Sequence, residues 1–191
     1  MSALHPPDGL TAERTELPDV LLLRPRVVGD ARGYFLESYN ERSFSRVTGC
    51  VERFVQDNQS RSSYGVLRGL HYQVSDHAQG KLVRVLTGRI FDVAVDLRRS
   101  SSAFGCWMAR YLDGQTHEQM WIPSGFAHGF LVVSEHAEVA YKTTRFYAPD
   151  TERCIRYDDA RLGIRWPLDT DPIVSARDAA APGLDDAETF P

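Results

Sequence analysis

The stretches Arg68-Gly69-Leu70-His71-Tyr72-Gln73 and Gly80-Lys81-Leu82-Val83-Arg84-Val85 decide how this chain of 191 residues is interpreted. Both have the composition of β-strands, and they place one histidine and one lysine on neighbouring strand-like segments. A histidine can move a proton near neutral pH, and a lysine can stabilise negative charge that develops on an oxygen. The pair therefore predicts proton transfer on a carbon acid.

Short strand-like runs, separated by glycine and polar turns, recur on both sides of this pair. The run Ile90–Leu97 alternates apolar side chains with Asp92 and Asp96, which is the period of a strand with two different faces. It follows Gly88-Arg89, whose spacing after the run Lys81–Thr87 is typical of a tight hairpin. The other runs are Val20–Leu23, Phe35–Tyr39, Met108–Leu112, Phe130–Val133 and Val139–Phe146. Many short strands of this kind predict an all-β sandwich, jelly roll or barrel.

Helical patterns are few and short. Asn40 can cap a helix through Val47, which Gly49 would end. Ser175 can cap a second helix that starts at Ala176. We therefore expect helices only at the periphery of the β-structure.

The composition is that of one ordinary globular domain. The formal net charge of −4 gives no reason to expect nucleic acid or an anionic membrane as a partner. No secretory signal and no apolar run of membrane-spanning length occur, so we expect a cytoplasmic protein. Three widely spaced cysteines without a CxxC pair describe neither a disulfide framework nor a zinc site. We expect one domain over residues 1–191, with an N-terminal segment at 1–16 and a loosely ordered tail at 185–191.

A metal site is the first alternative interpretation of the histidines. The pattern Pro123-x-Gly125-x-x-His128 resembles the second motif of the cupin superfamily. Metal-binding cupins add an H-x-H pair and a glutamate in the first motif, whereas Tyr72-Gln73 follows His71 here. Two separated histidines without a clear third ligand make a poor metal site. Since a phosphate-binding glycine loop and a nucleophile-elbow serine are also absent from the sequence, we expect no metal and no other cofactor.

Together the motifs resemble the dTDP-4-dehydrorhamnose 3,5-epimerase family. The resemblance runs from Leu17 to Leu184 and depends on the order and spacing of several segments. These are Asp30–Glu37, Val55–Ser60, Arg68–Gln73, Gly80–Val85, Asp92–Arg98, Ile122–Phe130, Tyr141-Lys142, Leu162–Pro167 and Ser175–Asp178. The resemblance implies a cupin-type jelly roll, or double-stranded β-helix, with a few short peripheral helices. It also implies a homodimer that needs no metal and acts on a dTDP-linked 4-keto-6-deoxy sugar.

The implied reaction can be rebuilt from the residue types. The ketone at C4 acidifies the hydrogens on C3 and C5, so that removal of either gives an enolate, and return of a proton to the opposite face inverts that carbon. The matching catalytic positions are His71 as base, Asp178 as its orienting carboxylate, Lys81 as oxyanion stabiliser and Tyr141 as acid. Without the resemblance, Asp178 is better interpreted as the acid of a capping box with Ser175.

Further positions match substrate-binding residues of the family. Arg32 and Arg68 match contacts to the diphosphate, which suits a planar and permanently charged guanidinium. The positions around the nucleotide and the sugar are Phe35, Glu37, Gln56, Asn58, His128 and Phe146. Phe146 stands where the family often has a tyrosine, so this chain keeps a stacking face there and loses a hydroxyl group.

Other functions stay open at this point. A mono-epimerase would invert only C3 or only C5, and a cupin sugar ketoisomerase would shift the keto group. A sugar-nucleotide-binding protein would bind without turnover, and a metal-dependent cupin dioxygenase is the least favoured. The set His71, Lys81, Tyr141 and Asp178 favours epimerisation over these alternatives.

Overall fold

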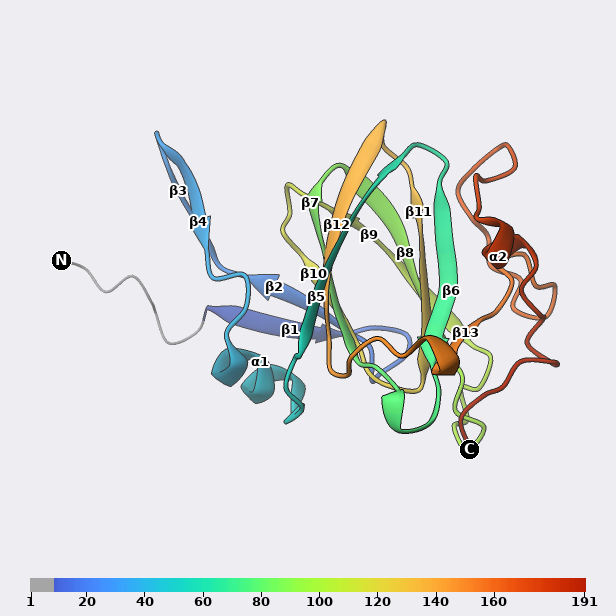
Figure 1. Cartoon of the computed structure of the whole chain (residues 1–191). Helices are drawn as coiled ribbons and strands as arrows, with labels where there is room; N and C mark the ends of the chain where they lie inside the picture. Colours follow the sequence, from blue (N-terminus) through green and yellow to red (C-terminus); the bar gives the residue numbers. More distant parts are fainter. Residues whose placement is uncertain (1–8) are drawn as a thin grey trace.

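Two antiparallel β-sheets pack face to face in the computed structural model, which describes residues 9–191 (Figure 1). The six-stranded sheet contains, in sheet order, β1 (Leu10–Arg14), β2 (Leu21–Pro25), β10 (Gln119–Ile122), β7 (Lys81–Thr87), β12 (His136–Thr143) and β5 (Gln56–Ser63). The five-stranded sheet contains β13 (Glu152–Cys154), β6 (Leu67–Gln73), β11 (Phe126–Val132), β8 (Arg89–Asp96) and β9 (Trp107–Asp113). The predicted all-β jelly roll is confirmed.

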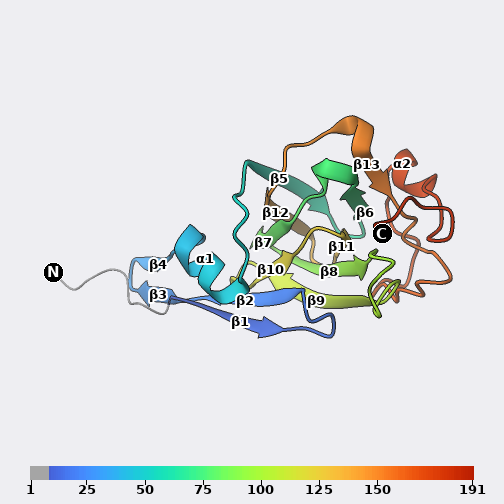
Figure 2. The same ribbon diagram turned by 90° about the horizontal axis from the view of Figure 1, so that it is seen from below.

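The remaining elements lie around this sandwich. The hairpin of β3 (Val27–Asp30) and β4 (Gly33–Leu36) projects away from it in both views (Figures 1 and 2). The helices are α1 (Glu41–Thr48), α2 (Ala176–Ala179) and the 3-10 turns η1 (Ser75–His77) and η2 (Pro149–Thr151). Within the described residues, neither α-helix has the length and apolar character that crossing a membrane would require.

Both helix predictions are confirmed. The Asn40 side chain accepts hydrogen bonds from the N–H groups of Arg42 and Ser43, at 3.0 and 3.2 Å, and so begins α1. Gly49 ends the helix in the left-handed conformation, at φ 72°. The buried Phe44 holds α1 against the outer face of the six-stranded sheet by edge contacts with aromatic rings.

The predicted hairpin around Gly88 is wrong. β7 pairs with β10 and β12, whereas β8 pairs with β11 and β9, so the turn between them carries the chain from one sheet to the other. A Cβ atom at Gly88 would lie 2.0 Å from the His136 carbonyl oxygen, and φ there is +80°. Glycine is therefore required for close backbone approach as well as for the turn. A two-residue spacing cannot distinguish this connection from a hairpin.

The two faces of β8 differ, as the alternation in its sequence predicts. The face that carries the acidic residues is the one that points into the space between the two sheets. Ile90 and Ala94 belong to the core between the sheets, and Asp92 shares their face. Val93 and Val95 instead pack on the opposite face, beneath the C-terminal segment. The five-stranded sheet is consequently covered on both faces, and its interior contains a fully buried carboxylate.

The C-terminal segment covers the outer face of the five-stranded sheet and includes residues 185–191, where a loosely ordered tail was expected. Leu184 and Ala187 are buried in the outer core. The Phe190 N–H donates to the Leu97 carbonyl at 3.1 Å, and the Phe190 carbonyl accepts from the Arg99 N–H at 2.9 Å. Full burial of one leucine side chain contributes about 2 kcal/mol, which favours ordering of the tail.

The other strand-like runs correspond to strands whose ends differ by a few residues from the predicted ones. β4 ends at Leu36 and not at Tyr39 as predicted, and β12 ends at Thr143 and not at Phe146. β1, β3, β5, β10 and β13 were not predicted. β5 has no apolar side chain on either face, and the others are short.

Candidate active site

A cavity of about 430 Å³ lies between the two sheets, and its walls are largely polar. Among the residues that line it are His71, Lys81, Tyr141, Arg68, Gln56, Asn58, His128, Phe130, Tyr147 and Glu152. His71 comes from β6 in the five-stranded sheet, and Lys81 comes from β7 in the six-stranded sheet. The two side chains expected on neighbouring strands thus belong to opposing sheets and share one cavity.

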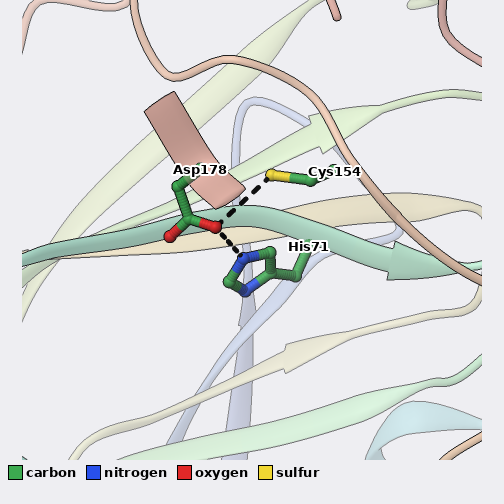
Figure 3. Close-up of side chains that lie close together, drawn as sticks. All are labelled: His71, Cys154 and Asp178. Atoms are coloured by element: carbon green, nitrogen blue, oxygen red, sulfur yellow. Dashed lines mark hydrogen bonds and ion pairs between the residues drawn. The ribbon is translucent and has the colours of Figure 1, made fainter. Parts of the chain in front are cut away.

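Asp178 reaches His71 from α2, 107 residues further along the chain (Figure 3). Its Oδ1 lies 2.7 Å from His71 Nε2, and its Oδ2 accepts from the Gly69 N–H at 3.4 Å. The Asp178 N–H donates to the Ser175 hydroxyl at 3.1 Å, which starts the helix. Asp178 therefore contributes to the helix start, as its local sequence predicts, and contacts His71 as well.

The protonation of this pair follows from its surroundings. Burial acts to raise the pKa of Asp178, but hydrogen bonds from His71, Gly69 and Ser175 outweigh it and hold that pKa below its usual value. An ionised carboxylate only accepts hydrogen bonds, so His71 Nε2 carries a proton. Nδ1 is then the nitrogen that can take a proton from a ligand. The His71 side chain is 32% exposed and that of Asp178 is 5% exposed.

Lys81 is a buried cation beside this histidine. Its Nζ donates to the His71 carbonyl at 3.0 Å. Burial lowers the pKa of Lys81 to about 8, while the negative charges of Glu152 and Asp92 act in the opposite direction. The ammonium is thus available near neutral pH in a site where a developing oxyanion is poorly solvated.

Tyr141 and Glu152 complete the titratable groups of the cavity wall. Burial, together with the charge of Glu152, raises the pKa of Tyr141 above its usual value, so its hydroxyl keeps its proton at neutral pH. Glu152 accepts from the Tyr147 hydroxyl at 2.7 Å and pairs with Arg177. These bonds outweigh the effect of burial and hold the pKa of Glu152 below its usual value.

A second histidine–carboxylate pair lies deeper in the sandwich. His128 Nε2 is 2.7 Å from Asp92 Oδ1, and both side chains are buried. Asp92 Oδ2 is the one buried side-chain oxygen or nitrogen of residues 9–191 without a hydrogen-bond partner. Such an unsatisfied acceptor destabilises the fold by roughly 1 to 3 kcal/mol. The attraction between the Asp92 carboxylate and the Lys81 ammonium offsets part of this loss.

The structure brings most of the predicted site residues together. His71, Lys81 and Tyr141 line the cavity with Gln56, Asn58, Arg68 and His128, and Asp178 lies directly behind His71. The Gln56 side-chain amide donates to the side-chain Oδ1 of Asn58 at 2.8 Å, and Arg68 Nε donates to the Ser62 hydroxyl at 3.0 Å. The polar wall is therefore already hydrogen-bonded before a ligand arrives.

Four predicted binding residues lie outside this wall. The Arg32 side chain is 89% exposed and pairs with Asp30 at the tip of the β3–β4 hairpin. Phe35 and Phe146 are exposed, and Glu37 accepts a hydrogen bond from the Asn40 side chain at 3.1 Å. None of the four lines the cavity of a single chain.

Several residues in or beside the cavity were not predicted, among them Phe130, Tyr147, Asp92, Glu152 and Cys154. Asp92 was noticed only as a polar position of an alternating strand, and Glu152 and Cys154 lie on a three-residue strand too short to show a pattern. Cys154 is buried and its Sγ lies 3.8 Å from Asp178 Oδ1. Burial raises the pKa of its thiol to about 12, with a further contribution from Asp178.

Fold and cavity together define a cupin-type jelly roll with an acid–base site. A model of the dTDP-4-dehydrorhamnose 3,5-epimerase family matches residues 14–186. The dTDP-4-dehydrorhamnose 3,5-epimerase of Pseudomonas aeruginosa is 55% identical over 182 residues, which are 95% of this chain and 100% of that protein. The chain belongs to the dTDP-4-dehydrorhamnose 3,5-epimerase family.

Solved structures agree with this assignment. The epimerase RmlC of Legionella pneumophila, in complex with dTDP-4-keto-L-rhamnose, has a TM-score of 0.91 and 47% identity, covering 94% of this chain and 95% of that one. The 3'-monoepimerase ChmJ of Streptomyces bikiniensis, in complex with dTDP-quinovose, has a TM-score of 0.86 and 31% identity. That match covers 91% of this chain and 87% of ChmJ. The fold is therefore shared by enzymes that invert different numbers of carbons.

We expect turnover to fall as the pH rises through about 8, because Lys81 loses its proton there and an uncharged amine stabilises an oxyanion poorly. Tyr141 cannot be the cause, since its pKa lies above its usual value. The measurement is kcat between about pH 6 and 10. The control is Lys81→Arg, whose guanidinium stays charged across this range, so its alkaline limb should be flat even if its rate is lower. If kcat falls equally at high pH in the wild type and in Lys81→Arg, a group other than Lys81 causes the fall.

Proposed function

We propose that this protein is a dTDP-4-dehydrorhamnose 3,5-epimerase that acts in dTDP-rhamnose biosynthesis in the cytoplasm. It would invert C3 and C5 of dTDP-4-dehydro-6-deoxy-D-glucose and release dTDP-4-dehydro-L-rhamnose. The observation that carries the proposal is the convergence of the His71–Asp178 pair, Lys81 and Tyr141 on one cavity, in a chain of this family.

The first step is removal of a proton from the carbon beside the ketone. His71 Nδ1 takes the C–H proton, and the electron pair of that bond moves to the C4 oxygen as the enolate forms. Asp178 stabilises the imidazolium that results, because it is ionised and bonded to Nε2. Lys81, whose side chain is buried, supplies a positive charge for the oxyanion.

The second step returns a proton to the opposite face of the same carbon. The Tyr141 hydroxyl, which burial keeps protonated, gives its proton as the enolate collapses to the ketone. The phenolate then regains a proton from water, and His71 returns its proton to water, so that the enzyme ends unchanged. Tyr141 lies on β12 of the sheet opposite His71, which suits transfer from two faces of one sugar ring.

Inversion of both carbons is favoured over mono-epimerisation by the degree of similarity. The 3,5-epimerase of Pseudomonas aeruginosa is 55% identical to this chain, whereas the 3'-monoepimerase ChmJ is 31% identical. The same four side chains can serve both carbons if the ring shifts between the two deprotonations. A ketoisomerase would instead need proton transfer at an oxygen-bearing carbon and its neighbour without inversion.

The nucleotide would be bound between two copies of the chain. Arg32 and Phe35, the predicted diphosphate and base contacts, are exposed on a hairpin that projects from the sandwich (Figure 1). The neighbouring side chains Val28 and Tyr34 are also exposed, which leaves an apolar surface without cover. In a two-fold dimer, this hairpin of one copy could reach the cavity of the other and complete its binding site.

The proposal is tested by incubating the protein with dTDP-4-keto-6-deoxyglucose in deuterated water and following C3 and C5 by NMR. We expect deuterium at both carbons with inversion of both. His71→Ala should slow exchange by about 10² to 10⁴-fold while nucleotide binding is kept, because only the base is lost. His77→Ala is the matched control, since its side chain is exposed and lies outside the cavity. Inversion at one carbon would indicate a mono-epimerase, and nucleotide binding without any exchange would contradict the proposed activity.

The dimer is tested by mixing two variants that are each impaired. One carries Arg32→Ala and Phe35→Ala on the hairpin, and the other carries His71→Ala in the cavity. If the hairpin serves the partner's cavity, mixed dimers contain one complete site, and an equal mixture should regain about a quarter of the wild-type rate. A mixture of His71→Ala with Tyr141→Phe is the control, because both changes affect the same cavity and should not complement. Failure of the first mixture, with dimers shown by sedimentation, would place the hairpin outside the partner's site.

A further inference from the structure

His71, Cys154 and Asp178 bring three different metal-binding atoms together (Figure 3). Cys154 on β13 pairs directly with His71 on β6, and directly opposed residues of antiparallel strands point to the same side of the sheet. Asp178 enters from α2 and lies between them, with Oδ1 at 2.7 Å from Nε2 and 3.8 Å from Sγ. All three ligand atoms lie within 4.8 Å of one another.

This donor set matches one kind of ion better than others. Imidazole nitrogen, cysteine sulfur and carboxylate oxygen are the ligands of Zn²⁺, with bonds of about 2.0 to 2.3 Å. Bonds of that length in a tetrahedral site separate ligand atoms by roughly 3 to 4 Å. The Oδ1–Nε2 distance of 2.7 Å is shorter than this range, the Oδ1–Sγ distance of 3.8 Å lies inside it, and no two of the ligand atoms are more than 4.8 Å apart. Binding of an ion therefore requires small movements only, chiefly a lengthening of the His71–Asp178 contact. Mg²⁺ and Ca²⁺ prefer oxygen ligands only, which makes the thiol a selective feature.

The thiol has no task in the proposed reaction. Epimerisation uses an imidazole, an ammonium and a phenol, and Cys154 neither lines the cavity nor contacts Lys81 or Tyr141 through any hydrogen bond recorded for the described chain. Its burial and its neighbouring carboxylate keep it protonated and therefore slow to react as a nucleophile. Among residues 9–191, no second group of three such ligand-type side chains comes together.

We propose that His71, Cys154 and Asp178 form a binding site for a thiophilic divalent cation, Zn²⁺, that inhibits the enzyme. An ion enters from the cavity, where His71 is partly exposed, and a cavity water completes its fourth position. Sγ releases its proton to solvent as it binds the ion, and the imidazole proton moves from Nε2 to Nδ1 so that Nε2 can bind the ion as well. With Nε2 on the ion and Nδ1 protonated, His71 can no longer act as a base. The inhibitory consequence rests on the proposed function, but the binding site does not.

Binding is tested first, without reference to activity. The full-length protein is titrated with Co²⁺, which reports a bound thiolate through its charge-transfer absorption, and with chelator-buffered Zn²⁺ in calorimetry. We expect one ion per chain and a thiolate band. Cys154→Ser should lose the band and bind Zn²⁺ at least about tenfold more weakly. The control Cys106→Ser changes an exposed cysteine and should behave as wild type.

Two further measurements keep the outcome decisive. His71→Ala removes a second ligand and should also weaken Zn²⁺ binding at least about tenfold, which covers the case in which Cys154→Ser does not fold. In the deuterium exchange assay, the Zn²⁺ concentration for half inhibition should rise in Cys154→Ser by the same factor as its dissociation constant. Unchanged Zn²⁺ affinity in both variants, or no binding up to about 1 mM, would overturn the proposal. Zn²⁺ binding to a protein that shows no exchange would overturn the epimerase function and leave the metal site standing.

Discussion

The hydrogen bond between His71 and Asp178 connects the cavity to the C-terminal part of the molecule. α2 has only four residues, and packing of the C-terminal segment on the outer face of the five-stranded sheet holds this region in place. Leu184 and Ala187, which are remote from any chemistry, therefore contribute to the position of the carboxylate. Fold stability and the orientation of the imidazole depend on the same apolar cover.

A second constraint is the burial of charge inside the sandwich. Moving the Lys81 pKa from 10.5 to about 8 corresponds to roughly 3 kcal/mol of lost stability for its ammonium form. The carboxylates of Glu152 and Asp92 offset part of this loss, and without them Lys81 would be neutral at a lower pH. The unsatisfied oxygen of Asp92 is a cost of the same arrangement. The sandwich thus keeps a buried cation beside the cavity, and a buried cation stabilises an enolate more strongly than one in bulk water.

The sequence predicted the sandwich and the centre of the site because both depend on local patterns. Alternation identified β8, the Asn40 and Gly49 pair identified α1, and two strand-like motifs identified His71 and Lys81, whereas Tyr141 was implied by the family resemblance. β5 was missed because it lines a polar cavity, so its inward side chains are as hydrophilic as its outward ones. A strand of the active site lacks the hydrophobic period by which strands are recognised.

The remaining errors concern pairings between distant segments. The strand after Gly88 joins the five-stranded sheet, and the C-terminal segment covers Val93 and Val95. Both facts depend on residues far away in the sequence, so a short stretch of sequence cannot predict them. The contact between Asp178 and His71 was implied by family resemblance and not by any pattern in the chain. Cys154 and Glu152 were missed for the same reason, since their importance comes only from the residues opposite them.

Base catalysis by His71 requires a proton on Nε2, which donates a hydrogen bond to Asp178, and a free lone pair on Nδ1. The most direct measurement is the ring-nitrogen NMR spectrum of the ¹⁵N-histidine-labelled protein, with His71 assigned by comparison with His71→Ala. We predict that neutral His71 shows a protonated Nε2 and an unprotonated Nδ1, and that Asp178→Asn removes this preference. A neutral His71 with its proton on Nδ1 would contradict the account, because the nitrogen that faces the substrate could then not act as a base.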